Sequence, residues 1–201
     1  IAATAAPMFK KLSLELGGKN PNIIFDDADI EKALKTTINT SFLNQGEICL
    51  CGSRLLIHES IYDKVKNRIV EEAKKLKVGN PNNDDTRTGA IVSKPHFEKV
   101  LSYVELAKGE GGQILTGGRA LNPEGCESGW FIEPTVIEGL GPQCRINTEE
   151  IFGPVISLLP FKDEQEALEI ANATEYGLAA TIWTENLTRA HRLAANLEFG
   201  I

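Results

Sequence analysis

The sequence contains few of the residues that mark specialised classes of protein. Four cysteines in 201 residues are too few for a disulfide-stabilised scaffold. No apolar run approaches the roughly 20 residues that a membrane-spanning helix requires. The net charge of −7 disfavours binding to nucleic acid or to an anionic membrane. These absences indicate an ordinary globular protein with reduced thiols, which we expect in the cytoplasm or an organelle matrix.

Several local signals are also missing. The cysteines and histidines do not have the spacing of a zinc site, so we expect no bound metal. No Gly-x-Gly-x-x-Gly fingerprint links a strand to a helix. The chain starts at Ile1 without an initiator methionine and stops at Ile201 without a tail, so we expect a piece of a longer protein that is cut at both ends.

The hydrophobic patterns that are present predict strands alternating with helices. Strands are expected over residues 12–16, 21–25, 54–58, 131–137 (broken by Pro134), 155–161 and 178–184. Helices are expected from Asp27 or Asp29 to Gly46, from about Ser60, after Pro95, over residues 164–172 and from near Asn186. Residues 109–118 and 121–129 are expected to be glycine-rich connectors. This order predicts one α/β domain over residues 1–201, with a mostly parallel sheet flanked by helices.

Cys49 is the first candidate for chemistry. Most free cysteines are buried structural residues, and this is the commoner role for such a side chain. Here the thiol is expected on a loop that leaves a buried helix, between Gly46 and Gly52 and close to Arg54. This position favours a reactive thiol. Cys51 is interpreted as a small packing residue.

Glu15 is the second candidate. Most glutamates at the end of a strand are simply solvated, and this is the default interpretation. Glu15, however, is the only charged residue in the segment 12–18. In an apolar strand, desolvation raises the pKa of a carboxyl group, which suits a general base that works near neutral pH. A thiol and a carboxylate together indicate a nucleophile and a base, the combination that thioester chemistry uses.

Three segments, taken in order, resemble the NAD(P)-dependent aldehyde dehydrogenase superfamily. They are residues 14–21 (Leu-Glu-Leu-Gly-Gly-Lys-Asn-Pro), residues 42–54 around Cys49, and residues 149–155 (Glu-Glu-Ile-Phe-Gly-Pro-Val). Residues 44–51 resemble most the aminomuconate-semialdehyde dehydrogenase branch. In that stretch Glu47 replaces the commoner glutamine, and Leu50-Cys51 is typical of the branch.

The resemblance implies the catalytic domain of such an enzyme and a role for five residues. The Cys49 thiolate would attack the aldehyde, with the oxyanion held partly by the Cys49 backbone N–H. Hydride would pass to NAD, with NADP also open, and Glu15 would activate the water that hydrolyses the thioester. Glu150 would contact the nicotinamide ribose hydroxyls, Phe152 would pack near the nicotinamide, and Lys99 would lie near the same ribose.

The resemblance also implies parts that this chain does not contain. A dinucleotide-binding domain and C-terminal oligomerisation strands would complete a homo-oligomer, either a dimer or a tetramer. We therefore expect the isolated 201-residue chain to be inactive and not to bind NAD. Three alternatives stay open: a CoA-acylating relative, a nucleotide-independent acyltransferase or hydrolase, and a non-catalytic homologue. Glu15 favours hydrolysis over acylation of CoA. The identity of the small aldehyde stays open as well.

Overall fold

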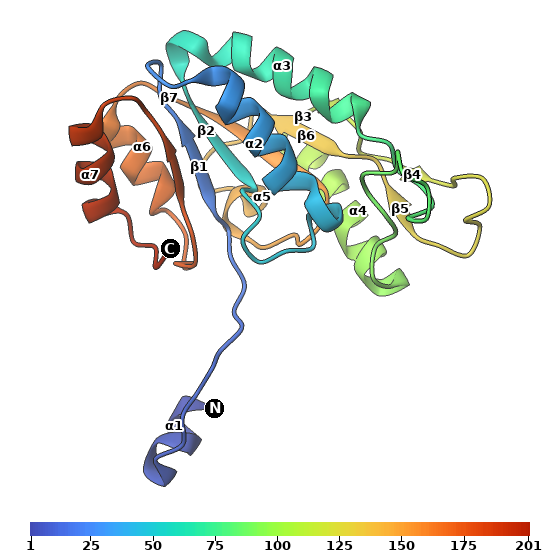
Figure 1. Cartoon of the computed structure of the whole chain (residues 1–201), viewed down its shortest axis with the longest axis horizontal. Helices are drawn as coiled ribbons and strands as arrows, with labels where there is room; N and C mark the ends of the chain where they lie inside the picture. Colours follow the sequence, from blue (N-terminus) through green and yellow to red (C-terminus); the bar gives the residue numbers. More distant parts are fainter.

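A computed structural model describes residues 1–201 and shows an α/β body from which the first sixteen residues project (Figure 1). A 6-stranded sheet has the order β3-β6-β7-β2-β1-β8. All neighbouring strands are parallel except β3, which pairs antiparallel with β6. The predicted α/β fold with a mostly parallel sheet is confirmed. The sheet strands are β1 (Pro21–Ile24), β2 (Arg54–His58), β3 (Gln113–Thr116), β6 (Thr135–Glu138), β7 (Val155–Phe161) and β8 (Thr181–Trp183). A separate two-stranded sheet joins β4 (Ala120–Leu121) and β5 (Phe131–Ile132).

Helices cover both faces of this sheet (Figure 1). The α-helices are α1 (Ala2–Ala5), α2 (Ile30–Phe42), α3 (Tyr62–Lys75), α4 (Lys94–Gly109), α5 (Arg145–Thr148), α6 (Glu164–Ala171) and α7 (Leu187–Asn196). None of them is both long enough and apolar enough to cross a membrane. Of the two expected caps, Asp27 and Asp29, it is Asp29 that begins α2. Its carboxylate accepts a hydrogen bond from the Lys32 backbone N–H at 3.1 Å.

The core lies on both sides of the central strands, which is why most of their residues are apolar. In β1, Ile24 packs with α2 and α3, whereas its neighbour Ile23 packs with α6 and α7. In β2, Leu55 and Ile57 join the first cluster and Leu56 joins the second. Successive side chains of a strand point to opposite faces, so a sheet covered on both faces needs a continuous apolar run.

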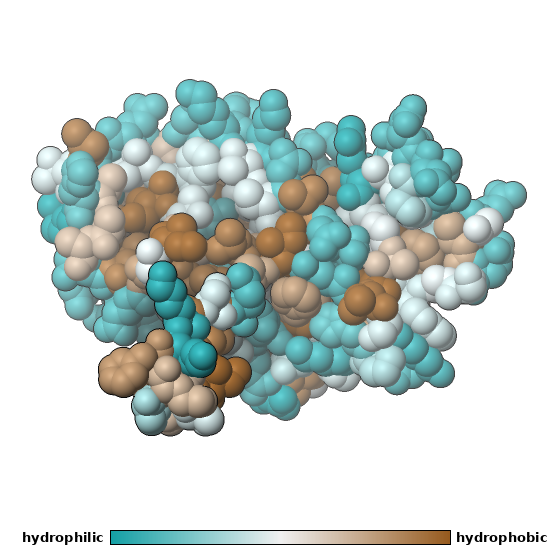
Figure 2. Space-filling view, turned by 60° about the horizontal axis from the view of Figure 1, so that its bottom comes forward, coloured by the Kyte–Doolittle hydropathy of each residue, from teal (hydrophilic) through white to brown (hydrophobic).

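The expected strand at residues 12–16 is wrong. Residues 10–20 form no regular element, and Leu12, Leu14 and Leu16 are 43%, 49% and 63% exposed. Within this chain no second strand lies beside them, so their alternating pattern has no sheet to pack on. Figure 2 shows this side of the molecule, where hydrophobic surface lies on the body around the base of the projecting segment. We call residues 1–16 the arm and the rest of the chain the body.

Other boundaries differ by a few residues. Helix α2 ends at Phe42, before the expected end at Gly46, and a 3₁₀ turn over Leu43–Gly46 follows it. Strand β3 lies inside the expected connector 109–118, and the short helix α5 was not predicted. Strand β8 is shorter than the expected residues 178–184. Strands β2 and β7 have the expected bounds.

Candidate active site

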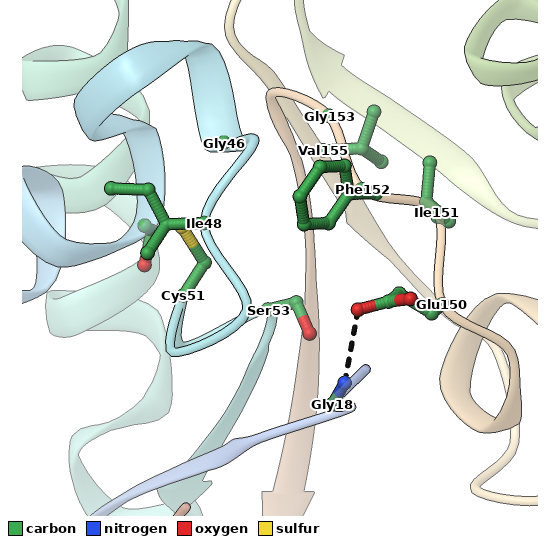
Figure 3. A pocket seen from close by; sticks show the side chains of 11 residues that line it. Gly18, Gly46, Ile48, Cys51, Ser53, Glu150, Ile151, Phe152, Gly153 and Val155 are labelled. Carbon is green, nitrogen blue, oxygen red and sulfur yellow. Dashed lines mark hydrogen bonds between the residues drawn. The ribbon is translucent and has the colours of Figure 1, made fainter. Parts of the chain in front are cut away.

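Cys49 lies on a turn between α2 and β2, and the backbone before it is unusual. Asn44 and Gln45 have positive φ angles of 50° and 46°, and Gly46 has a φ of 73°. A Cβ atom at Gly46 would collide with the backbone carbonyl of Gly153. Glycine therefore lets the turn before Cys49 pack against the loop of residues 150–153, and Figure 3 shows these two segments facing each other.

One buried asparagine holds the backbone around Cys49. The Asn20 side-chain amide donates to the carbonyls of Cys49 at 2.7 Å and Cys51 at 3.0 Å. Its Oδ1 accepts from the Ala179 N–H at 3.1 Å. Asn20 is only 2% exposed, so loss of any of these bonds would leave a buried polar group unpaired. The sequence interpretation missed Asn20, although a polar residue directly before the buried strand β1 was a usable signal.

The two neighbouring thiols differ in environment. Cys51 is 8% exposed, and burial raises the pKa of its thiol to about 11. A thiol with that pKa is protonated at neutral pH and is a poor nucleophile. Cys51 lines a small, narrow pocket (Figure 3), whereas Cys49 is less buried and lines a larger and more open pocket. This difference favours Cys49 as the reactive thiol.

The open pocket brings together all five residues that the sequence singled out. Its wall includes Cys49, Glu15, Glu150, Phe152 and Lys99. These side chains come from the arm, the turn after α2, helix α4 and the loop before β7, so only the fold makes them neighbours. One expectation about them is wrong: Glu15 is exposed at the end of the arm and is not desolvated in an apolar strand.

Glu150 holds the segment that directly follows the arm. Its Oε1 accepts from the Gly18 N–H at 2.9 Å (Figure 3), and a Cβ atom at Gly17 would run into the same carboxylate. Lys99 donates from Nζ to the backbone carbonyl of Glu150 at 3.0 Å. The structure thus places Lys99 against the backbone of the loop that carries Glu150 and Phe152.

Two buried cations lie where the arm meets the sheet. Arg54 is fully buried and donates to the carbonyls of Lys19 at 2.9 Å, Ile170 at 2.8 Å and Ala171 at 2.8 Å. The last two carbonyls belong to the end of α6, where a positive charge is favoured. Burial, followed by the charge of Arg54, lowers the pKa of the Lys19 ammonium to about 7. The segment after the arm is therefore anchored in the core.

Comparison with known proteins places this geometry in one family. The family model described as "Aldehyde dehydrogenase family" matches residues 1–201. The 2-aminomuconic semialdehyde dehydrogenase of Mus musculus is 48% identical over 204 residues, which cover 100% of this chain and 42% of that protein. A betaine aldehyde dehydrogenase of Mesorhizobium japonicum is 42% identical over 200 residues, which cover 100% of this chain and 41% of that protein.

Solved structures agree with this assignment. A betaine aldehyde dehydrogenase from Staphylococcus aureus, solved in complex with NAD+, superposes with a TM-score of 0.93 and 41% identity. The match covers 98% of this chain and 39% of that chain. The present chain therefore spans less than half the length of the relatives that it matches.

Proposed function

The chain belongs to the aldehyde dehydrogenase family, and we propose that the protein oxidises a small aldehyde to the carboxylic acid with NAD or NADP. The observation that most directly supports this proposal is the pocket that Cys49, Glu15 and Glu150 share. The 48% identity to 2-aminomuconic semialdehyde dehydrogenase favours a semialdehyde of that type as the substrate. The proposal includes a homo-oligomer, a dimer or tetramer, because the family resemblance implies one.

The first chemical step uses the Cys49 thiolate. Its sulfur attacks the aldehyde carbon and forms a C–S bond, and the carbonyl oxygen becomes an oxyanion that the Cys49 N–H stabilises. Asn20 holds the carbonyls of Cys49 and Cys51, so it fixes the backbone that presents this N–H. The adduct then loses hydride from the former aldehyde carbon, and a thioester on Cys49 remains.

The bound nicotinamide cofactor would supply the hydride acceptor for this oxidation. The residues present fit such a group. Glu150 accepts one N–H on Oε1, and a carboxylate has further lone pairs for ribose hydroxyls. The Phe152 ring borders the same pocket and offers an apolar surface to an aromatic ring. Lys99 adds a positive charge at the rim.

Glu15 completes the cycle by hydrolysis. Its carboxylate takes a proton from water while the water oxygen attacks the thioester carbon. The C–S bond breaks, the acid leaves, and the Cys49 thiolate is regenerated. Glu15 then releases its proton to solvent and is again a carboxylate. Hydrolysis of the thioester by water distinguishes this reaction from one in which the acyl group is transferred to CoA.

The test is an assay of the active protein with a panel of aldehydes and with NAD and NADP in turn. We expect formation of NADH or NADPH that is matched by carboxylic acid, and no activity for Cys49→Ala. An acyl-CoA product that needs added CoA would contradict the hydrolytic step. Ester hydrolysis without any nucleotide-linked oxidation would show that the protein is a nucleotide-independent thiol hydrolase.

A further inference from the structure

Phe152 has a backbone conformation that its residue type rarely adopts. Its φ angle of 60° lies in the left-handed region, which is costly for a bulky side chain. Its carbonyl oxygen lies 2.5 Å from Nε2 of His96, and the two rings meet edge to face with centroids 5.9 Å apart. A carbonyl oxygen can only accept, so this Nε2 carries the hydrogen and donates it. His96 thus holds the peptide group of the unusual residue.

Glu47 connects the same histidine to the turn that carries Cys49. Its side chain is only 6% exposed, and Oε1 lies 3.5 Å from His96 Nε2. This is a close polar contact and not a second hydrogen bond, because the one hydrogen on Nε2 is donated to the Phe152 carbonyl. The same Oε1 of Glu47 accepts from the Val92 N–H at 3.1 Å, just before α4, and Oε2 accepts from Gln45 Nε2 at 3.0 Å. Both oxygens of a carboxylate are acceptors, so Glu47 satisfies the Val92 N–H and the Gln45 side-chain N–H at the same time. An amide at this position would place one donor against another.

We propose that Glu47 and His96 are positioning residues that couple the Cys49 turn to the conformation of Phe152. Glu47 and Cys49 belong to one turn, and His96 and Lys99 lie one helical turn apart on α4. His96 donates to the carbonyl of Phe152 and Lys99 donates to that of Glu150. Helix α4 therefore supports both ends of residues 150–152, which the proposed function assigns to the cofactor. This inference rests on the proposed function, because Phe152 is there assigned to the nicotinamide.

Kinetics of the active protein provide the first test. His96→Ala should lower kcat/KM for NAD roughly tenfold, because the Phe152 carbonyl loses its donor. Hydrolysis of an activated ester, which needs only the thiol, should stay within about twofold of wild type. His96→Gln should recover most of the lost efficiency, since its side-chain N–H can reach the same carbonyl. His191→Ala, on the exposed face of α7, is the matched control and should behave as wild type.

The pair should also show coupling. In the double variant Glu47→Ala/His96→Ala, kcat/KM for NAD should fall by clearly less than the product of the factors measured in the two single variants. The reason is that both substitutions break the same contact between Glu47 and His96. Losses that multiply would overturn the proposal. Equal losses of oxidation and ester hydrolysis in His96→Ala would also overturn it, since they would indicate general damage to the fold.

Amide hydrogen exchange provides a test that does not depend on activity. In His96→Ala, exchange should become faster both in residues 44–49 and in residues 150–153, and it should stay unchanged in β2. Faster exchange confined to α4 would contradict the coupling. If wild type oxidises no aldehyde with NAD or NADP, the proposed function fails, while the exchange measurement still decides whether the pair couples the two segments.

Discussion

The arm and the body contribute one catalytic candidate each, and they hold it in different ways. The body fixes Cys49 through the hydrogen bonds of Asn20 and the close packing at Gly46. The arm carries Glu15 on an exposed segment that projects from the body (Figure 1). A motif can therefore identify both residues, but only for Cys49 do contacts within this chain fix the geometry.

The largest effect is expected when Cys49, the proposed nucleophile in the body, is replaced. Cys49→Ala should reduce both aldehyde oxidation and ester hydrolysis by more than roughly 10³-fold, because both reactions need the same thiol. Cys51→Ala, the matched control, should retain activity within about tenfold, since the buried thiol of Cys51 contributes packing. Steady-state rates of the two variants check this prediction. A dead Cys51→Ala beside an active Cys49→Ala would reverse the assignment.

The next effect tests the arm's carboxylate. Glu15→Gln keeps the size of the side chain and removes the base, so turnover should fall by roughly 10²- to 10⁴-fold. Acylation should survive, and rapid mixing should show a burst of about one NADH per active site before a slow steady rate. Loss of the burst as well would assign Glu15 to activation of Cys49. Turnover at the wild-type rate would remove Glu15 from the mechanism.

Replacement of Asn20, which holds the backbone around Cys49, should have a smaller effect, and this effect is on stability. Asn20→Ala leaves two buried carbonyls and one N–H without a partner, and it should lower the free energy of unfolding by about 2–4 kcal/mol. Urea unfolding of the 201-residue chain measures this loss. A change below about 0.5 kcal/mol in Asn20→Ala would show that these bonds do not hold the turn.

Buried Lys19 makes the junction of arm and body sensitive to pH. Its folded pKa of about 7 lies below the ordinary 10.5, so between these values the unfolded chain binds more protons than the folded chain. Stability therefore rises with pH in that window, by at most about 1.4 kcal/mol per pH unit. The stability of wild type relative to Lys19→Met should rise between pH 7 and pH 10. Ile23→Val changes no titratable group, and its difference from wild type should not depend on pH.

The smallest effect is expected on the arm itself. Leu14 is 49% exposed, so Leu14→Ala should change the stability of this chain by less than about 0.5 kcal/mol. Leu56 is fully buried between β2 and the helices α6 and α7, and Leu56→Ala should cost about 2–5 kcal/mol. Thermal or urea unfolding measures both. Similar losses for the two variants would show that the arm packs on the body.

The same contrast explains what the sequence could predict. Strands β2 and β7 have their expected bounds because their centres are apolar and buried on both faces. Asp29 is one of the two expected caps of α2, because a cap is a local signal. The end of α2 was missed because Gly46 is needed for its contact with Gly153, which is far away in the sequence.

The residues of the candidate site also divide into those that the sequence predicts and those that only the structure shows. Cys49, Glu15, Glu150 and Phe152 are identified from motifs, and Lys99 from the resemblance of its helix position. The fold brings all five to one pocket. The exposure of Glu15 was not foreseen, because strand periodicity does not reveal whether a neighbouring strand is present in the chain. The position of Asn20 directly before a buried strand was a usable signal, but its partners at Cys49 and Ala179 lie far away in the sequence. The contact between Glu47 and His96 likewise joins distant segments, and no local pattern reports it.

Mass spectrometry of the covalent intermediate tests most directly that Cys49 is the nucleophile and Glu15 the base. The Glu15→Gln protein is mixed with aldehyde and NAD, quenched in acid after the burst, and digested for peptide analysis. The account predicts an acyl group on Cys49, near one per active site, and little or none in wild type, where hydrolysis clears it. An acyl group on Cys51, or NADH formation without any acylated cysteine, would contradict the account.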